Sequence, residues 1–270
     1  MRRMIDFEID GDRLVGTLDE GDATTGLLIV SGGNEIRSGA YAGQAAMAKH
    51  FASLGTPVFR YDRRGVGDSE GSNNGFESTA DDIAAAVAAF RTEAPHMDRI
   101  VAFGNCDAAT SLAFYHDGID SLVLANPWVI EATASEPNAP TQPSAAAVRA
   151  RYLARLNNPR SLLDLLTGKI DLKKLAGGLA KAAQKETPTG LAARLTTSLA
   201  ASSVPTQLLV AERDTTALAF IGAYKTALFE TVRSRTDVKL SKCDSASHSF
   251  ADATAKAWLY DHIGRALSGA

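Results

Sequence analysis

The sequence predicts an α/β fold with a mostly parallel central sheet flanked by helices. Short apolar runs of strand character alternate with helical segments through residues 1–129 and again through residues 202–270. The run 27–30 is continuously apolar, as expected of a strand buried on both faces. Between the two halves, at 130–201, strand-like runs give way to prolines and helical segments. We therefore expect a core of residues 1–129 and 202–270, with a helical lid at 130–201 between the sixth and seventh strands.

Each element follows from local pattern. The first two strands form a hairpin, because Asp10, Gly11 and Asp12 supply a tight turn between two alternating segments. Further strands are expected at 27–30, 57–62, 100–103, 121–128, 205–210 and 238–240. Helical spacing predicts helices at 44–54, 78–91, from 107 onward, 217–233 and 251–267.

Composition excludes several classes of protein. The 270 residues are 45% hydrophobic and 22% charged, and the net charge of −3 argues against a nucleic-acid binder. Two cysteines do not make a disulfide framework and fit a reducing compartment. Acidic residues follow Arg2 and Arg3 where a signal peptide would be apolar, and no apolar run reaches the roughly 18 residues of a membrane span. We expect a cytoplasmic protein, and no metal or organic cofactor, since no Cys/His pair has ligand spacing.

The stretch 100–111 carries the strongest chemical signal. Four strand-like residues run into Gly104-Asn105-Cys106-Asp107-Ala108, and a helical segment follows at once. This is the layout of a nucleophile elbow, G-x-S-x-G, with Cys106 in the nucleophile position and Ala108 as the closing small residue. A cysteine at such a junction is commonly a small core residue. The remaining signals favour a nucleophile.

A thiol nucleophile needs a base and a carboxylate that orients the base. Asp214 follows the seventh predicted strand and His248 follows the eighth, in the order nucleophile, acid, histidine. All three residues then fall at the carboxyl edge of the sheet, where ligands bind in open α/β folds. Asp244 is the stronger rival for the acid and Asp107 the weaker one. The other histidines are interpreted as structural or solvated: His50, His96, His116 and His262.

Oxyanion donors are also expected. The Gly32-Gly33-Asn34 segment ends the third strand, and the N–H of Gly33 or Asn34 is the predicted donor on that side. Its partner is the N–H of Asp107, directly after the nucleophile. The alternative is an ordinary glycine-rich turn.

Two resemblances to known protein families narrow the class to which the protein could belong. Residues 62–69 resemble the D-x-R-G-x-G-x-S turn of α/β-hydrolases. The whole chain more closely resembles the type 1 hydrolase associated with the exosortase A system of exopolysaccharide-producing bacteria. That likeness rests on Gly32-Gly33, the cysteine elbow at 104–109, the Asn-Pro-Trp strand end at 124–129, and lid segments at 151–156 and 162–171. It implies a cytoplasmic α/β-hydrolase fold with a Cys106–Asp214–His248 triad.

A cysteine that faces a helix N-terminus and a histidine favours a thiolate–imidazolium pair, which attacks thioesters and activated esters. We therefore expect a hydrolase of a carboxylic ester or thioester that works through a thioacyl-enzyme. The alternatives are an acyltransferase with the same triad, and a non-catalytic binding module linked to exopolysaccharide or protein-sorting machinery.

The insertion bears on the substrate. Residues 130–201 hold ten Lys/Arg and five Asp/Glu, a net +5, which would favour an anionic small-molecule ester, although solvated helix faces explain it equally. Its leucines either line an acyl pocket or pack against the body. Cys243 is expected to be inert; the alternative is an oxidised pair with Cys106.

Overall fold

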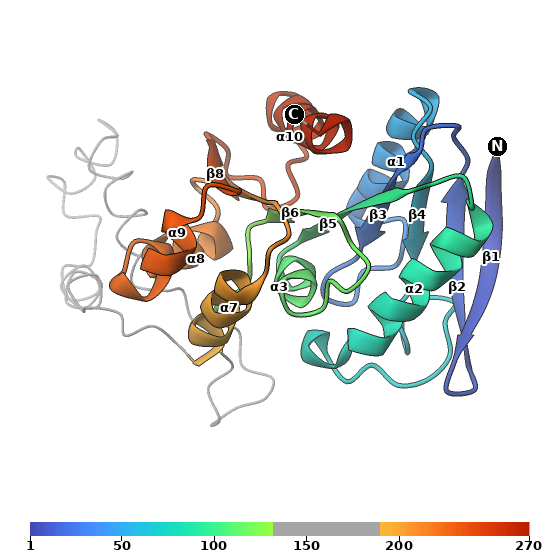
Figure 1. Cartoon of the computed structure of the whole chain (residues 1–270), viewed down its shortest axis with the longest axis horizontal. Helices are drawn as coiled ribbons and strands as arrows, with labels where there is room; N and C mark the ends of the chain where they lie inside the picture. Colours follow the sequence, from blue (N-terminus) through green and yellow to red (C-terminus); the bar gives the residue numbers. More distant parts are fainter. Residues whose placement is uncertain (132–189, 270) are drawn as a thin grey trace, which may run out of the picture.

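A computed structural model describes residues 1–131 and 190–269 (Figure 1). In this part of the chain eight strands form one sheet in the order β1-β2-β4-β3-β5-β6-β7-β8. The β1–β2 and β2–β4 pairs are antiparallel and every other pair is parallel, which confirms the predicted fold class. The strands are β1 (Arg2–Ile9), β2 (Asp12–Asp19), β3 (Thr25–Val30), β4 (Val58–Tyr61), β5 (Arg99–Asn105), β6 (Ser121–Ala125), β7 (Thr206–Ala211) and β8 (Val238–Cys243).

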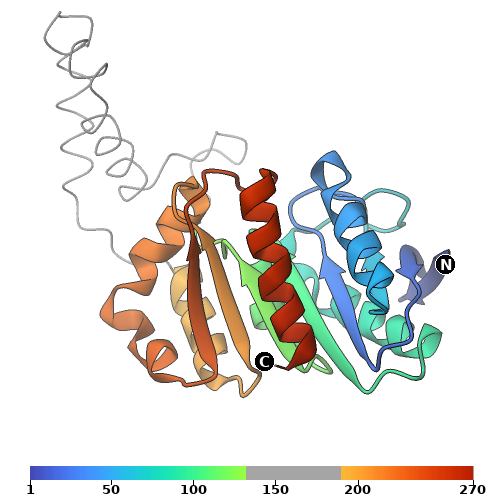
Figure 2. The same ribbon diagram turned by 90° about the horizontal axis from the view of Figure 1, so that it is seen from above.

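Helices cover both faces of the sheet (Figures 1 and 2). Helices α1 (Gly43–Ser53) and α10 (Ala253–Ser268) lie side by side on one face. The opposite face carries α2 (Ala80–Glu93), α3 (Asp107–Phe114), α7 (Gly190–Ala201), α8 (Thr215–Tyr224) and the short α9 (Glu230–Ser234). Single 3-10 turns occur at Ala40–Ala42, Phe76–Ser78 and Ala227–Phe229.

The first hairpin has the predicted turn. Asp10 and Gly11 both have positive φ, 50° and 89°, between the end of β1 and the start of β2. Positive φ at both central positions defines a type I′ turn, whose twist matches that of the flanking strands. This antiparallel hairpin forms one edge of the sheet.

The helix predicted at 217–233 is divided in the structure. Helix α8 ends at Tyr224, and a 3-10 turn and α9 follow. A continuous helix turns about 100° per residue, so Phe220 and Phe229, nine positions apart, would face opposite sides. The break lets both reach the core, where their ring centroids lie 5.8 Å apart and both side chains are fully buried. Burial of Phe229 overrides the local helical pattern.

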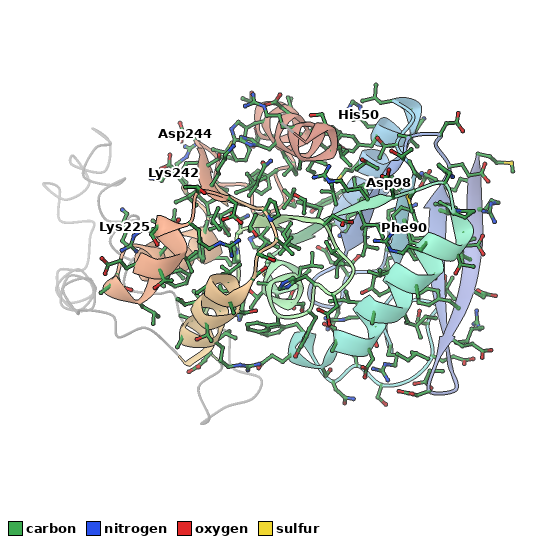
Figure 3. All side chains as sticks on the ribbon, viewed as in Figure 1. His50, Phe90, Asp98, Lys225, Lys242 and Asp244 are labelled. Carbon is green, nitrogen blue, oxygen red and sulfur yellow. The ribbon has the colours of Figure 1, made fainter. Side chains whose placement is uncertain are left out.

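Two apolar clusters stabilise the sheet, one on each face. On the α2 side, Phe90 stacks on Phe59 of β4 at 5.5 Å; Figure 3 labels Phe90 on the side of α2 that faces the sheet. On the α1–α10 side, side chains such as Met47 and Leu259 pack on β5 and β6.

The end of the predicted insertion is a helix of the body. Residues 190–201 form α7, whose Leu195 and Leu199 are fully buried and whose Ser198 Oγ donates to the Ala113 carbonyl of α3 at 2.5 Å. The rest of the predicted lid, 132–189, lies outside the described residues, together with its prolines, its leucines and most of its charges. The division into core and lid stays a prediction. None of the helices in the described ranges is long and apolar enough to cross a bilayer.

Candidate active site

Cys106 occupies a strained turn between β5 and α3. Its backbone has φ 64° and ψ −126°, a conformation that residues with a side chain seldom adopt. Two backbone hydrogen bonds hold it: the Cys106 N–H donates to the Ala125 carbonyl at 2.9 Å, and the Trp128 N–H donates to the Cys106 carbonyl at 3.2 Å. The half-buried thiol therefore lies at the carboxyl edge of the sheet, as predicted for an elbow.

Small residues around the turn are required by space. A Cβ on Gly104 would lie 2.8 Å from the Ala108 carbonyl group, and a Cβ on Gly32 would lie 2.8 Å from the Asn105 carbonyl oxygen. Both distances are shorter than a carbon atom tolerates. The turn can close because Ala108, in the first turn of α3, packs against Gly104 of β5, which has no side chain.

His248 and Asp214 are brought together. Nδ1 of His248 lies 3.0 Å from Oδ2 of Asp214. Asp214 is buried and is the N-cap residue of α8, where the same Oδ2 accepts the Ala217 N–H at 3.0 Å. The carboxylate is therefore oriented by a helix terminus on one side and binds the imidazole on the other.

The pKa shifts of this pair have physical causes. The hydrogen bond to Asp214 raises the pKa of His248 to about 10, a hydrogen bond to Cys106 adds to the rise, and burial opposes it. For Asp214, burial by itself favours the neutral acid, but the hydrogen bonds from His248 and Ala217 outweigh burial and lower its pKa. Both directions describe an imidazolium that is paired with a carboxylate at neutral pH.

Two asparagines hold the histidine loop. The His248 carbonyl accepts from Asn126 Nδ2 at 3.0 Å and from Asn105 Nδ2 at 3.2 Å. Asn126 is fully buried, has φ 43°, and its Oδ1 accepts the Ala211 N–H at 2.9 Å. Sequence reasoning missed these residues. The available signal was an asparagine at the carboxyl end of two neighbouring strands, β5 and β6.

The predicted oxyanion donors differ in their surroundings. The Gly33 N–H donates to both carboxylate oxygens of Asp107, at 2.8 and 2.9 Å. Arg63 Nη2 donates to the Gly33 carbonyl. That carbonyl shares a trans peptide with the Asn34 N–H, which therefore points away from Arg63. The Asp107 N–H is the first of α3 and has no acceptor within the helix.

Asp244, the stronger rival for the acid, and Cys243, the second cysteine, have other surroundings. Asp244 has an 84% exposed side chain and pairs with Arg213 at 2.9 Å, at the outer end of β8 (Figure 3). Cys243 ends β8, and three strand intervals of about 4.8 Å separate β8 from β5, so its distance from Cys106 exceeds the reach of a disulfide. Burial raises the pKa of Cys243.

The remaining histidines have contacts away from the elbow. His116 contacts Ser202, His262 contacts Gln207, His96 contacts the Gly21 carbonyl, and His50 packs on Tyr260. Within the described ranges no group of three or more His, Cys, Asp or Glu side chains is arranged to hold a metal ion.

A cavity of about 320 Å³ opens beside Cys106 and His248. It extends between α1 and α10, and its walls are mostly apolar. The side chains that line it include Met47, Phe103, Phe250, Leu259 and Tyr260.

Solved structures share this fold over nearly the whole chain. The esterase Pf2001 of Pyrococcus furiosus superimposes with a TM-score of 0.65 at 16% identity, covering 99% of this chain and 91% of that one. The α/β-hydrolase GrgF from Penicillium sp. sh18 superimposes with a TM-score of 0.60 at 18% identity, covering 99% of this chain and 97% of that one. The thioesterase domain of the curacin biosynthetic pathway superimposes with a TM-score of 0.56 at 14% identity, covering 97% of this chain and 99% of that one. No curated protein matches the chain by sequence.

The family is shown by sequence. The family model described as "Serine aminopeptidase, S33" matches residues 22–255, which include the elbow, Asp214 and His248. The family description refers to a serine enzyme, whereas the strained turn after β5 holds Cys106 in this chain. Because the match spans most of the chain, the protein belongs to this family of α/β-hydrolases.

Proposed function

We propose that the protein hydrolyses a carboxylic ester or thioester, with Cys106 as nucleophile, His248 as acid and base, and Asp214 as the residue that orients His248. The observation that carries the proposal is the imidazole of His248, which is hydrogen-bonded to Asp214 and lines the same cavity as Cys106 on its strained elbow. A residue held at positive φ on a strand-to-helix turn is costly, and such strain is concentrated at functional sites.

The proposed reaction has two steps. The Cys106 thiolate attacks the acyl carbon and forms a C–S bond, while the leaving alcohol or thiol takes its proton from His248. Water then gives a proton to His248 and attacks the thioacyl carbon, and the thiolate departs as the carboxylic acid forms. The N–H groups of Asp107 and of Asn34 or Gly33 receive the oxyanion in each step.

The electrostatics favour leaving groups that need little protonation. An imidazolium with a pKa of about 10 releases its proton reluctantly. Thiolates and activated alkoxides depart with little help, whereas amines must be protonated as they leave. This supports thioesters and esters over the amide bonds of an aminopeptidase substrate.

The finer assignments stay predictions. Membership of the exosortase A-associated group rests on sequence motifs, and the 151–156 and 162–171 segments lie outside the described residues. The cytoplasmic location and the preference for an anionic substrate likewise rest on the sequence alone.

The test is capture of the thioacyl-enzyme. The purified protein is mixed briefly with a panel of acyl thioesters, activated esters and amino-acid amides, quenched in acid, and weighed intact beside Cys106→Ala. We expect an acyl-sized mass increase with thioesters and esters in the wild type only. Turnover that persists in Cys106→Ala would show that Cys106 is not the nucleophile. An adduct formed only from amides would indicate that the protein acts on peptide-like amide bonds and not on esters.

Two further outcomes separate the alternatives. Acyl transfer to an added amine or alcohol in preference to water would make the protein an acyltransferase. No adduct with any substrate, combined with slow alkylation of Cys106 at neutral pH, would favour a binding module.

A further inference from the structure

We propose that the cavity between α1 and α10 binds the acyl chain of the substrate, and that this chain is apolar, unbranched and short. The inference rests on the proposed function. It adds the chemical class of the acyl group and the residues that limit the length of the acyl chain.

The cavity leads directly away from the nucleophile. Its lining includes Cys106, His248 and residues of α1 and α10. These two helices lie side by side on one face of the sheet (Figure 2). Helix α1 follows the loop after β3 and α10 follows the loop after β8, so both helices start at the carboxyl edge, where Cys106 lies. Residues early in either helix are therefore near the reacting carbon, and later residues lie deeper.

The walls suit a hydrocarbon chain. Met47 of α1, Leu259 of α10, Phe103 of β5 and Phe250 of the histidine loop all line the cavity. All four side chains are at least 96% buried in the protein and present only carbon or sulfur atoms. An acyl chain that enters here replaces water against apolar atoms, which is worth about 0.8 kcal/mol per methylene, or roughly fourfold in kcat/KM.

Aromatic rings pack together where Tyr260 lines the cavity. Tyr260 of α10 packs on His50 of α1 with ring centroids 4.8 Å apart and on Phe51 at 5.5 Å; Figure 3 labels His50 on α1. His50 and Phe51 lie about one helical turn, roughly 5.4 Å, beyond Met47. The cavity volume of about 320 Å³ is at the small end of ligand pockets, so only a short chain fits.

Two charged side chains line the cavity. Glu35 and Lys256 are both exposed, and Nζ of Lys256 lies 5.7 Å from the centroid of the Tyr260 ring. A charged group on the substrate can therefore be accommodated near these two side chains, but not against the four apolar ones. Branches near the carbonyl carbon would meet Met47 and Phe103.

The test is the chain-length profile of hydrolysis. Acyl thioesters from acetyl to dodecanoyl, all with one leaving group, are compared by kcat/KM and by the mass of the acyl-enzyme. We expect kcat/KM to rise about fourfold per methylene and then to fall where the chain meets Tyr260. Tyr260→Ala enlarges the cavity and should move the maximum to longer chains.

A second variant fills part of the cavity and should have the opposite effect on the preferred chain length. Ala46 is exposed on α1 and lines the cavity, so Ala46→Trp fills the upper part without entering the core, and the maximum should move to shorter chains. Lys49→Trp places the same ring on the same helix away from the cavity and should leave the profile of the wild type unchanged.

The outcomes are distinguishable. If the acyl-enzyme forms but neither Tyr260→Ala nor Ala46→Trp moves the maximum, the cavity does not bind the acyl chain; a profile that follows the size of the leaving group instead would assign the cavity to that group. If no acyl-enzyme forms, the proposed function fails. The cavity is then tested by titrating Cys106→Ala with octanoate, where the expected saturable binding is lost in Cys106→Ala/Ala46→Trp and its absence overturns the proposal.

Discussion

The backbone N–H of Gly33 donates to both carboxylate oxygens of Asp107, the residue that follows the nucleophile. A donor in the position predicted for oxyanion binding is thus occupied by an anion of the protein itself. The substrate must displace that carboxylate or use the Asn34 N–H in its place. The negative charge also lies where the transition state would develop its own.

Asp107→Ala frees the Gly33 N–H and removes the competing charge. We expect kcat/KM for activated esters to rise several-fold, because oxyanion donors are worth more when they are unoccupied in the ground state. The melting temperature should fall by a few degrees, since α3 loses a carboxylate in its first turn. Asp117→Ala, an exposed site on the loop after α3, is the matched control. A large fall in kcat/KM would instead mean that the Asp107 carboxylate assists the reaction.

Asp214→Asn tests the pairing with His248. The amide oxygen can still cap α8 at Ala217, but it withdraws the charge that raises the pKa of His248 to about 10. We expect the imidazole to titrate near its ordinary value of 6.5 and kcat to fall roughly 10²- to 10⁴-fold. NMR titration of ring-labelled histidine and steady-state kinetics report the two effects; an unshifted titration would contradict the assigned pair.

The same pair predicts how stability depends on pH. His248 binds its proton more tightly in the folded than in the unfolded chain, so its contribution is complete below about pH 6.5 and is lost as the pH rises towards 10. The lowered pKa of Asp214 adds stability that is present above its ordinary pKa of 3.8 and disappears in acid. The unfolding free energy of the wild type should therefore exceed that of Asp214→Asn most between about pH 4 and 6.5, and urea titrations at several pH values measure the difference. A gap that widens towards pH 10 would refute the linkage.

Asn126 is expected to be the most sensitive of the supporting residues. Asn126→Ala leaves the Ala211 N–H unpaired, removes one donor from the His248 carbonyl, and puts alanine at φ 43°. We expect a loss of about 2–4 kcal/mol in urea unfolding and a fall in kcat larger than any change in KM. Asn126→Gly relieves the backbone but not the hydrogen bonds, so it should lie between the wild type and alanine. Equal effects of the two variants would assign the loss to hydrogen bonds alone.

The two cysteines should react very differently. Cys106 opens into the cavity, whereas Cys243 is 7% exposed and burial raises its pKa. With iodoacetamide at neutral pH we expect one rapid alkylation, located at Cys106 by peptide mass, and a much slower second one. Mild oxidants should give no intramolecular disulfide. A Cys106–Cys243 linkage would contradict the strand order.

The sequence predicted the elements whose patterns are local. Alternating and continuous apolar runs identified the strands, and Asp10-Gly11 identified the hairpin turn. The elbow was also local, since Gly104, Cys106 and Ala108 lie within five residues and their spacing reflects a steric requirement. The pairing of Asp214 with His248, in preference to Asp244, agrees with the position expected from strand order.

What the sequence could not predict depends on contacts between distant segments. Nothing near Gly33 in the chain indicates that Asp107 will accept its N–H, because 74 residues separate them. The carbonyl of His248 is bound by asparagines from two other strands, and Phe229 interrupts a regular helical pattern to reach the ring of Phe220. In each case tertiary packing selects among local conformations of similar energy.

The position of β5 within the sheet has a dynamic consequence. It is paired along its length with β3 and β6, so its amides should exchange with deuterium only on global unfolding. His248 lies instead on the loop between β8 and α10, held by a few side-chain hydrogen bonds. The nucleophile is thus carried by one of the slowest-exchanging parts of the molecule and its base by a fast-exchanging one. Adjustment during turnover should occur in the histidine loop, while the cysteine stays in place.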